Sequence, residues 1–290
     1  MMPESSLRKF IKNRQGRYAE MVPEKTEENV PTSVSSSAKP AGEDDSSAEL
    51  PPIQSEPITA LLPIYNDRAT LQPTLEAWIS VLNSLNRDYE IILVDDASTD
   101  GSLDLAQTLA EKNPRVRPMR HETQAGFGAC LRTGLESARF PLLLISTCDG
   151  CYQPAELTRF LKWIDKVHLV AGYRSMDSKR YKRNWGERLY HWVARIIFGL
   201  RLKDPECWFF LARRLIFSRI PIQSTGPFAF AELLAKANFL GCLMSEAPVS
   251  YQPIPGANAK WSNSTLREKL TGFRRVFSHP DFGPAKLPEK

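Results

Sequence analysis

The segment from residue 58 to residue 171 alternates between short apolar runs and stretches of helical periodicity. The apolar runs are rich in Leu, Ile and Val and are bounded by polar turns, which is typical of buried strands. Strands are predicted over 58–62, 89–94, 116–119, 142–145 and 167–171. Helices are predicted over 71–85, 102–112 and 126–138, with one more opening at Pro154. This alternation predicts an α/β fold, in which a mostly parallel sheet is covered by helices on both faces.

The segments on either side of this pattern differ in composition. Residues 23–57 are rich in Pro, Ser, Glu and Lys and hold few large apolar side chains. Such a segment cannot bury enough surface to offset the entropy lost on ordering. We therefore predict a disordered N-terminal segment over 1–57, a domain over 58–255 and a helical, frayed tail over 256–290. Within the second half of the domain, helices are predicted over 185–198 and 228–237, and extended segments over 207–211 and 241–251.

Charge and cysteine usage exclude several classes of protein. The net charge of +5 is mild for 290 residues, so the sequence gives no reason to expect nucleic-acid binding. An odd count of five cysteines argues against a disulfide framework and favours a reducing compartment. No signal peptide is recognisable, and no apolar run reaches the roughly 20 residues that span a bilayer. We expect a cytoplasmic protein, with peripheral membrane contact open.

Acidic residues follow the predicted strands. In a parallel α/β sheet, ligands bind beyond the carboxyl ends of the strands. Asp95 and Asp96 come directly after the second strand, and Asp149 follows the fourth. One reading is structural: Asp96 and Ser98 would cap the next helix. The other is functional: Asp95 would accept hydrogen bonds from a base or ribose, and Asp96 would face the phosphates of a nucleotide.

Asp149 is a candidate metal ligand. A carboxylate at this edge can hold Mg²⁺ or Mn²⁺ against the two phosphates of a nucleotide-sugar, because both cations take oxygen ligands. The alternative is an ordinary turn aspartate within Cys148-Asp-Gly-Cys151. The same Cys pair raises the possibilities of a redox dithiol or half a zinc site, although no second Cys/His pair has matching spacing.

A basic cluster follows the fifth strand. It comprises Lys179-Arg-Tyr-Lys-Arg183, with Arg174 before it and Arg188 after it. A solvated loop is one interpretation. Beside a diphosphate site it is instead a candidate for binding a phosphate of donor or acceptor, since Arg reads phosphate bidentately.

Taken in order, these segments resemble the family-2 glycosyltransferases, and within them the polyprenyl-phosphate sugar transferases. The resemblance covers nearly all of 58–255. Its most distinctive segment is Tyr89-Glu-Ile-Ile-Leu-Val-Asp-Asp-Ala-Ser-Thr-Asp-Gly101. The other matching segments are Leu62-Pro-Ile-Tyr-Asn-Asp67, Gln124-Ala-Gly-Phe-Gly-Ala129, Asp149-Gly-Cys-Tyr-Gln-Pro154, Gly172-Tyr-Arg174 and Ala247-Pro-Val249. The resemblance implies a GT-A fold, with a Rossmann-like sheet, and transfer of a hexose from a UDP- or GDP-sugar.

The resemblance also implies roles for matching positions. The donor would contact Pro63, Tyr65, Asp67, Asp95, Asp96 and Gly126. Asp149 would ligate the metal, and Arg174 and Arg188 would bind the phosphate of a lipid acceptor. That acceptor would attack the anomeric carbon directly, with inversion. A lipid phosphate is already anionic and needs no strong base, whereas a hydroxyl acceptor would need one, for which Glu232 is the candidate.

The metal loop departs from the family pattern. The family usually reads D-x-D there, and the first acid of that motif is Thr147 in this chain. Fewer carboxylates lower the affinity for a divalent cation. A second hypothesis therefore stands beside the enzyme: a catalytically inactive relative that binds nucleotide, sugar or a partner protein.

Overall fold

The computed structural model describes residues 56–175, 202–204, 207–226, 228–252, 254 and 281. The chain divides into two compact units, Met1–Pro52 and Ile53–Lys290, and every described residue belongs to the second. The helix expected over 185–198, Arg188, the N-terminal segment and nearly all of the C-terminal tail lie outside the described residues. The domain boundaries at 58 and 255 stay a prediction.

The described elements follow the predicted alternation. The strands are β1 Ile58–Ile64, β2 Tyr89–Asp95, β3 Val116–Arg120, β4 Leu142–Ile145, β5 Leu169–Ser175, β6 Phe210–Arg213 and β7 Met244–Ser250. The α-helices are α2 Arg68–Ser84, α3 Ser102–Lys112, α4 Phe127–Ser137, α5 Leu157–Ile164 and α7 Ala229–Phe239. Two 3-10 turns, η2 Pro154–Glu156 and η3 Arg214–Arg219, precede α5 and follow β6.

Several predicted strand ends differ from the observed ones, and two of the differences bear on proposed site residues. Pro63 was expected to end the first strand, but β1 runs through it to Ile64 and pairs with β2 there. The proline is tolerated because β4 pairs with β1 only as far as Leu61, so the amide hydrogen that proline lacks has no partner to lose. Gly172 and Arg174 were expected after the fifth strand and lie inside β5, which extends to Ser175.

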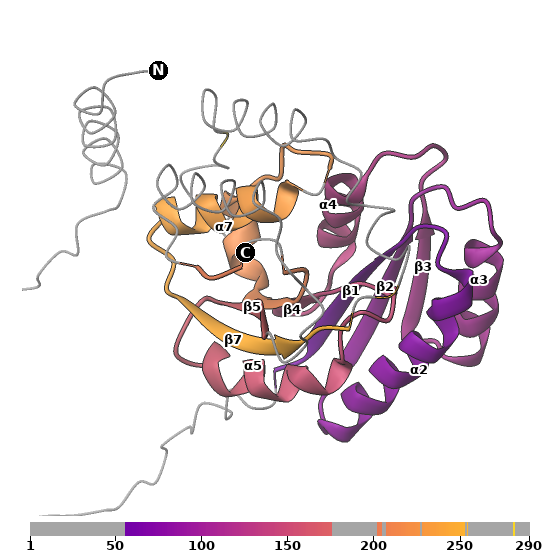
Figure 1. Ribbon diagram of the computed structural model, residues 1–290, viewed down its shortest axis with the longest axis horizontal. Coiled ribbons are helices and arrows are strands. Elements are labelled where there is room, and N and C mark those ends of the chain that lie inside the picture. Colours follow the sequence, from indigo (N-terminus) through magenta and orange to yellow (C-terminus); the bar gives the residue numbers. More distant parts are fainter. Residues whose placement is uncertain are drawn as a thin grey trace, which may run out of the picture. The chain divides into compact units, whose positions relative to one another are not determined.

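The sheet has seven strands in the order β3-β2-β1-β4-β6-β5-β7 (Figure 1). All neighbouring pairs are parallel except β4–β6 and β6–β5, so β6 is the antiparallel member. The α/β class and the mostly parallel sheet are confirmed. In Figure 1, α2 and α5 lie on one side of the strands, and α4 and α7 lie on the other. Because β1, β2 and β4 are parallel, their carboxyl ends meet at one edge of the sheet.

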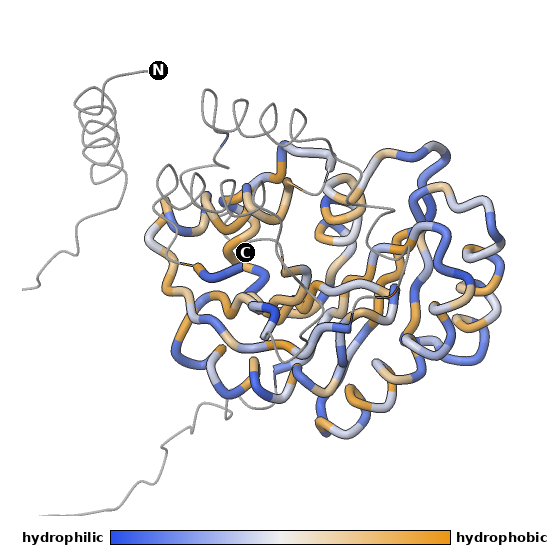
Figure 2. Tube along the Cα trace, viewed as in Figure 1, coloured by the Kyte–Doolittle hydropathy of each residue, from blue (hydrophilic) through white to orange (hydrophobic). Residues whose placement is uncertain are grey.

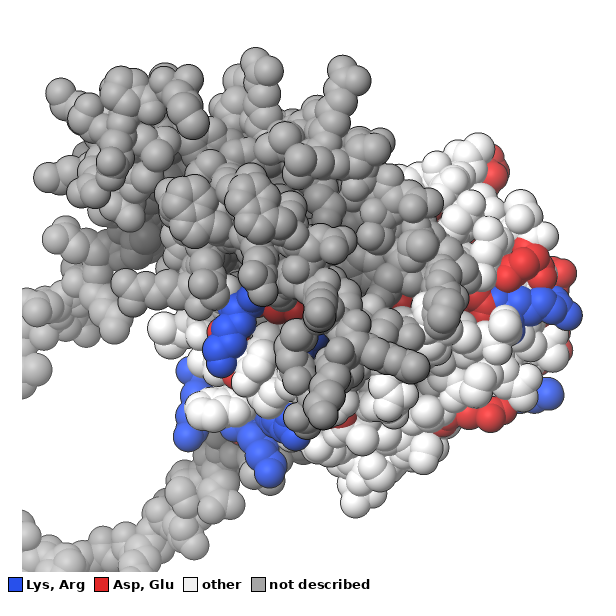
Figure 3. Space-filling view, viewed as in Figure 1, with Lys and Arg blue, Asp and Glu red and all other residues white. Residues whose placement is uncertain are grey.

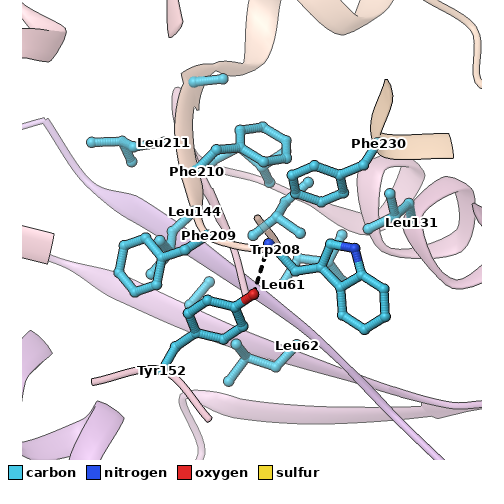
Figure 4. Packing of buried hydrophobic residues seen from close by; sticks show 14 of the residues in the cluster. Leu61, Leu62, Leu131, Leu144, Tyr152, Trp208, Phe209, Phe210, Leu211 and Phe230 are labelled. Atoms are coloured by element: carbon cyan, nitrogen blue, oxygen red, sulfur yellow. Dashed lines mark hydrogen bonds between the residues drawn. The ribbon is translucent and has the colours of Figure 1, made fainter. Parts of the chain in front are cut away.

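The core lies on both faces of the sheet. Every residue of β1, β2 and β4 is buried, as continuous apolar runs predict for central parallel strands. The hydropathic colouring in Figure 2 follows the same pattern, with hydrophobic strands and mixed helices. An aromatic cluster fills the region around β6: Phe210 meets Phe230 edge-on at 4.7 Å, and Phe209 meets Phe160 at 4.8 Å. There the Tyr152 hydroxyl accepts a hydrogen bond from the backbone N–H of Trp208 at 3.1 Å (Figure 4).

The described surface carries no extended field of one charge on the face shown in Figure 3. Basic side chains gather towards α5 and β7, and acidic and basic ones stand together towards α3. Among the described residues, no helix combines the length and the apolar character needed to cross a bilayer.

Candidate active site

The predicted acids meet at one edge of the sheet. Asp95 ends β2, opposite Ile64 of β1, and Ile145 of β4 pairs with Leu61 of β1. Asp67 follows β1 and Asp149 follows β4, so all three carboxylates emerge at the carboxyl ends of neighbouring strands. We call this the donor edge. Asp67, Asp95 and Asp149 are each at most 2% exposed.

Asp95 has one carboxylate oxygen that no described residue binds. Its Oδ2 accepts a hydrogen bond from the backbone N–H of Ser98 at 3.1 Å. Its Oδ1 is buried and has no hydrogen-bond partner among the described residues. The turn behind it is tight, with Ala97 at a φ of 59°. A buried carboxylate oxygen left unpaired costs free energy, so this geometry favours a ligand that donates a hydrogen bond to Oδ1.

Asp96 is fully buried and holds the start of α4. Its Oδ1 accepts the backbone N–H of Ala125 at 2.9 Å and lies 2.9 Å from Nδ1 of His121. Its Oδ2 accepts the N–H of Gly126 at 2.8 Å. Gly126 has a φ of 93°, and a Cβ there would lie 2.6 Å from the carbonyl oxygen of Thr225. The capping role considered for Asp96 is wrong: α3 begins after Gly101 without a side-chain cap, and Asp96 instead holds the two residues that precede α4.

His121 is a residue that the sequence did not single out. Its Nε2 lies 2.9 Å from Oγ1 of Thr133, so the ring bridges Asp96 and α4. Asp96, His121 and Cys130 are close enough to hold a metal ion. Hydrogen bonds already account for both oxygens of Asp96 and both ring nitrogens. Burial and the charge of Asp96 raise the pKa of the Cys130 thiol, which opposes the thiolate that a metal needs.

Asp149 also has one used and one open oxygen. Its Oδ1 accepts hydrogen bonds from Oγ1 of Thr147 at 2.8 Å and from the N–H of Cys151 at 3.0 Å. Its Oδ2 is buried with no hydrogen-bond partner among the described residues, as is Oγ of Ser146. One open carboxylate oxygen fits a single contact to a divalent cation whose other ligands are diphosphate oxygens and water. The Thr147 hydroxyl donates its hydrogen to Asp149, so Thr147 does not replace the missing acid.

The loop after β1 is braced against the loop after β2. Oδ2 of Asp67 accepts the N–H of Tyr65 at 3.0 Å, and the N–H of Asp67 donates to Oγ of Ser102 at 2.9 Å. Asn66, with a φ of 53°, accepts the N–H of Thr99 at 2.8 Å. Asp67 thus shapes this side of the donor edge from a buried position, and Tyr65 beside it is only partly buried.

The Cys148–Cys151 pair is not a reactive dithiol. Burial, with the charges of Asp67 and Asp149 adding to it, raises the pKa of Cys148 well above its usual value. Burial and the charge of Asp149 raise the pKa of Cys151 to about 12. Thiolates are the species that react and bind metal, so the redox and zinc hypotheses lose their chemical basis.

Arg174 is paired within the chain. Its Nε and Nη2 donate to the two oxygens of Asp204 at 2.6 and 2.9 Å, and Asp204 is 3% exposed. The guanidinium carbon also lies 5.4 Å from the ring centre of Tyr251. A bidentate pair of this kind fixes the orientation of the guanidinium. The second predicted phosphate-binding arginine, Arg188, lies outside the described residues.

Glu232 is fully buried and faces a loop. Its Oε1 accepts the N–H of Gln223, and its Oε2 accepts the N–H of Ser224, both at 2.8 Å. Lys236, also 0% exposed, lies 2.8 Å from Oε1. Both oxygens of this carboxylate are engaged, so its geometry favours a holding role over proton transfer. Sequence reasoning did not identify Lys236.

Several known proteins are similar in sequence to this chain. The model of glycosyl transferase family 2 matches residues 59–235, more than half of the chain. Undecaprenyl-phosphate mannosyltransferase of Micrococcus luteus is 27% identical over 231 residues, which are 75% of this chain and 93% of that protein. Dolichyl-phosphate beta-glucosyltransferase of Dictyostelium discoideum is 26% identical over 237 residues, 74% of this chain and 72% of the relative.

A solved structure shares the fold. It is glucosyl-3-phosphoglycerate synthase of Mycobacterium tuberculosis in complex with Mn²⁺, UDP-glucose and phosphoglyceric acid. The TM-score is 0.57 at 15% identity, and the match covers 78% of this chain and 81% of the other. The likeness confirms the GT-A fold. The match to the family model establishes that the chain belongs to glycosyl transferase family 2.

Proposed function

We propose that this glycosyltransferase moves a hexose from a UDP- or GDP-sugar to a polyprenyl phosphate. The observation that carries the proposal is the pair of open carboxylate oxygens, Oδ1 of Asp95 and Oδ2 of Asp149. Both are buried at one edge of the sheet with no hydrogen-bond partner among the described residues. A folded chain tolerates such oxygens where a ligand completes them.

The donor nucleoside lies against the ends of β1 and β2 in this proposal. Oδ1 of Asp95 accepts hydrogen bonds from the base or the ribose. Pro63, Tyr65 and Asp67 line the nucleoside pocket, and the braced loop between Asp67 and Ser102 keeps that wall in place. Asp96 and Gly126 contribute to the donor site indirectly. Asp96 accepts a hydrogen bond from the amide of Gly126, and this contact positions the start of α4.

Asp149 would hold a divalent cation at the diphosphate end of the donor. A bound Mg²⁺ or Mn²⁺ supplies charge neutralisation on the departing nucleoside diphosphate. The structural relative described above was solved with Mn²⁺ and UDP-glucose, which supports a metal of this kind. Oδ2 of Asp149 is the oxygen that would ligate the cation, because Oδ1 already accepts hydrogen bonds from Thr147 and Cys151.

The acceptor assignment is supported by the names of the relatives, which act on undecaprenyl phosphate and dolichyl phosphate. A phosphate oxygen of the acceptor attacks the anomeric carbon, and the bond from that carbon to the nucleoside diphosphate breaks with inversion. The attacking oxygen is already anionic, so no general base is required and Glu232 can remain buried. Arg174 and Arg188 are the candidates for binding the acceptor phosphate. A polyprenyl acceptor would also bring the chain to a membrane surface.

Transfer is tested with the purified chain, a panel of UDP- and GDP-hexoses and a short-chain polyprenyl phosphate, with and without Mn²⁺. We expect release of nucleoside diphosphate that depends on the acceptor, and formation of a sugar-phosphate-polyprenol. If no donor in the panel is consumed with the polyprenyl phosphate, the proposed transfer is excluded.

Thr147 favours a second candidate, a relative that binds the donor without transferring the sugar. Its hydroxyl donates a hydrogen bond to Oδ1 of Asp149, whereas the family pattern has a carboxylate at position 147. Calorimetry with UDP and GDP separates the two functions. Binding that is independent of Mn²⁺, together with no turnover of any donor, would support the non-catalytic candidate.

A further inference from the structure

We propose that the buried pair Glu232–Lys236 is a positioning device that holds the donor edge through the start of α4. It acts on the segment 221–226, called here the α7 loop. The inference rests on the proposed function only for the reaction that the pair serves, because its contacts are properties of the fold itself.

Both side chains of the pair form hydrogen bonds with the α7 loop. Glu232 accepts the amides of Gln223 and Ser224, both at 2.8 Å. Nζ of Lys236 donates to the carbonyl oxygen of Pro221 at 2.5 Å and to Oε1 of Gln223 at 3.0 Å. With Oε1 of Glu232 at 2.8 Å, the ammonium has three acceptors for its three donors. Two fully buried side chains on α7 thus fix the backbone of the α7 loop.

The α7 loop in turn holds the first turn of α4. The N–H of Gly128 donates to the carbonyl oxygen of Thr225 at 2.6 Å. Nη1 of Arg132 donates to the carbonyl oxygens of Ile222 and Ser224 at 3.1 and 3.0 Å. A Cβ on Gly128 would lie 2.1 Å from the oxygen of Ser224, so the two backbones are in direct contact. Neither segment can shift without displacing the other.

The start of α4 completes the connection to the donor edge. The amides of Ala125 and Gly126 donate to the carboxylate of Asp96 at 2.9 and 2.8 Å. Asp96 adjoins Asp95, whose open Oδ1 is proposed to bind the donor. The contacts therefore run without a break from α7 through the α7 loop and α4 to the donor edge.

The energetics favour a geometric role for the pair. A buried ion pair is weak evidence for stability, because desolvation of two charges offsets much of their attraction. Hydrophobic replacements of similar volume are often neutral or stabilising at such sites. A Leu–Met pair could not form the hydrogen bonds that Glu232 and Lys236 make with the α7 loop. The pair is thus expected to affect the placement of the loop more than the stability of the fold.

The test is the double variant Glu232→Leu/Lys236→Met, followed by amide hydrogen exchange. We expect exchange to rise roughly tenfold in the α7 loop and also in residues 124–129, since local opening reports lost local contacts. The donor KM should rise roughly tenfold with a smaller change in kcat. A rise confined to the α7 loop, or no rise at all, would overturn the proposal. So would an unchanged donor KM in an enzyme whose residues 124–129 exchange faster.

Two further variants keep the test decisive. Glu232→Gln/Lys236→Met removes both charges and keeps one acceptor for a loop amide, so it should give the same pattern with a smaller rise. It replaces the Leu/Met double variant if that protein does not fold. Glu90→Gln removes a buried charge at the opposite edge and should leave exchange at 124–129 unchanged. If the wild-type chain transfers no sugar, the proposed function fails, while the exchange data still decide whether the pair holds α4.

Discussion

Strand β2 carries buried acids at both ends, and the two ends use them differently. At its start, Glu90 accepts hydrogen bonds from Oγ1 of Thr59 at 2.8 Å and from the N–H of Arg139 at 2.7 Å, and it pairs with Arg117. At its end, Asp95 keeps an oxygen with no partner among the described residues. Both carboxylates are buried. The fully hydrogen-bonded carboxylate of Glu90 favours a structural role, whereas the open oxygen of Asp95 favours a ligand.

Helix α4 connects the two ends. Glu90 binds the amide of Arg139 just after the helix, and Asp96 binds the amides of Ala125 and Gly126 just before it. The same kind of contact therefore anchors α4 at both edges of the sheet. Among the described residues, open carboxylates stand beside the anchor only at the donor edge, so the comparison predicts that substitutions at the two edges separate activity from stability.

The largest effect is expected from Asp149→Ala. The proposed cation supplies several kcal/mol of charge stabilisation in the transition state, so kcat/KM should fall roughly 100-fold or more. The melting temperature should stay the same or rise, because the variant removes a buried and partly unpaired charge. Nucleoside diphosphate release and thermal unfolding measure the two quantities. A lower melting temperature with unchanged kcat/KM would place Asp149 among the fold-stabilising acids instead.

Asp95→Asn tests the other open oxygen. A hydrogen bond to a charged acceptor contributes about 1.5–3 kcal/mol, so the Kd for UDP or GDP should rise at least roughly tenfold. The amide keeps the size of the side chain and one acceptor for the N–H of Ser98. Calorimetry with the nucleotide that the wild type prefers is the measurement. An unchanged Kd would mean that Oδ1 does not contact the donor.

Glu90→Gln is the counterpart at the opposite edge. The substitution removes the charge facing Arg117 and leaves an amide group against that guanidinium. The Arg117 side chain is 29% exposed and water screens part of the pair, so we expect a loss of about 1–2 kcal/mol in the free energy of unfolding. Urea unfolding gives this value, and kcat with a saturating donor should not change. A fall in kcat at constant stability would contradict the separation of the two edges.

The sequence predicts the carboxylates of the donor edge better than it predicts the residues that hold that edge in place. Asp95 and Asp149 were identifiable because each follows an apolar strand, and parallel strands end together. His121 was not identifiable, since its partner Asp96 is 25 residues away and no periodicity links them. Lys236 lies within a helix whose apolar neighbours gave no sign of a buried ammonium. The direction of β6 was not predictable either, because an apolar run reads the same for a parallel and an antiparallel strand.

Thr147→Asp tests the donor edge by adding a charge, whereas the variants above remove one. It adds a carboxylate beside Asp149 and removes the hydroxyl that now binds Oδ1 of Asp149. Because the number of charged ligands tunes cation affinity, the Mn²⁺ concentration for half-maximal activity should fall roughly tenfold. Thr147→Val, which removes the hydroxyl without adding charge, is the control and should give no such fall. Equal Mn²⁺ dependence in both variants would argue against a cation at Asp149.

The smallest effect is expected from the thiols of the donor edge. The pKa of Cys151 is raised to about 12, so its thiolate fraction is lost as pH falls below that value. At pH 8 the thiol is therefore expected to be almost entirely protonated, and alkylation of the folded protein by iodoacetamide should be slow. Its rate should rise about tenfold per pH unit. Half-buried Cys242 should react first, and all five cysteines should react once the chain is unfolded in guanidinium chloride. Rapid alkylation of Cys148 or Cys151 in the folded protein would mean that this edge opens to water. The unpaired oxygens of Asp95 and Asp149 would then be solvated, and their case as ligand-binding groups would lose its physical basis.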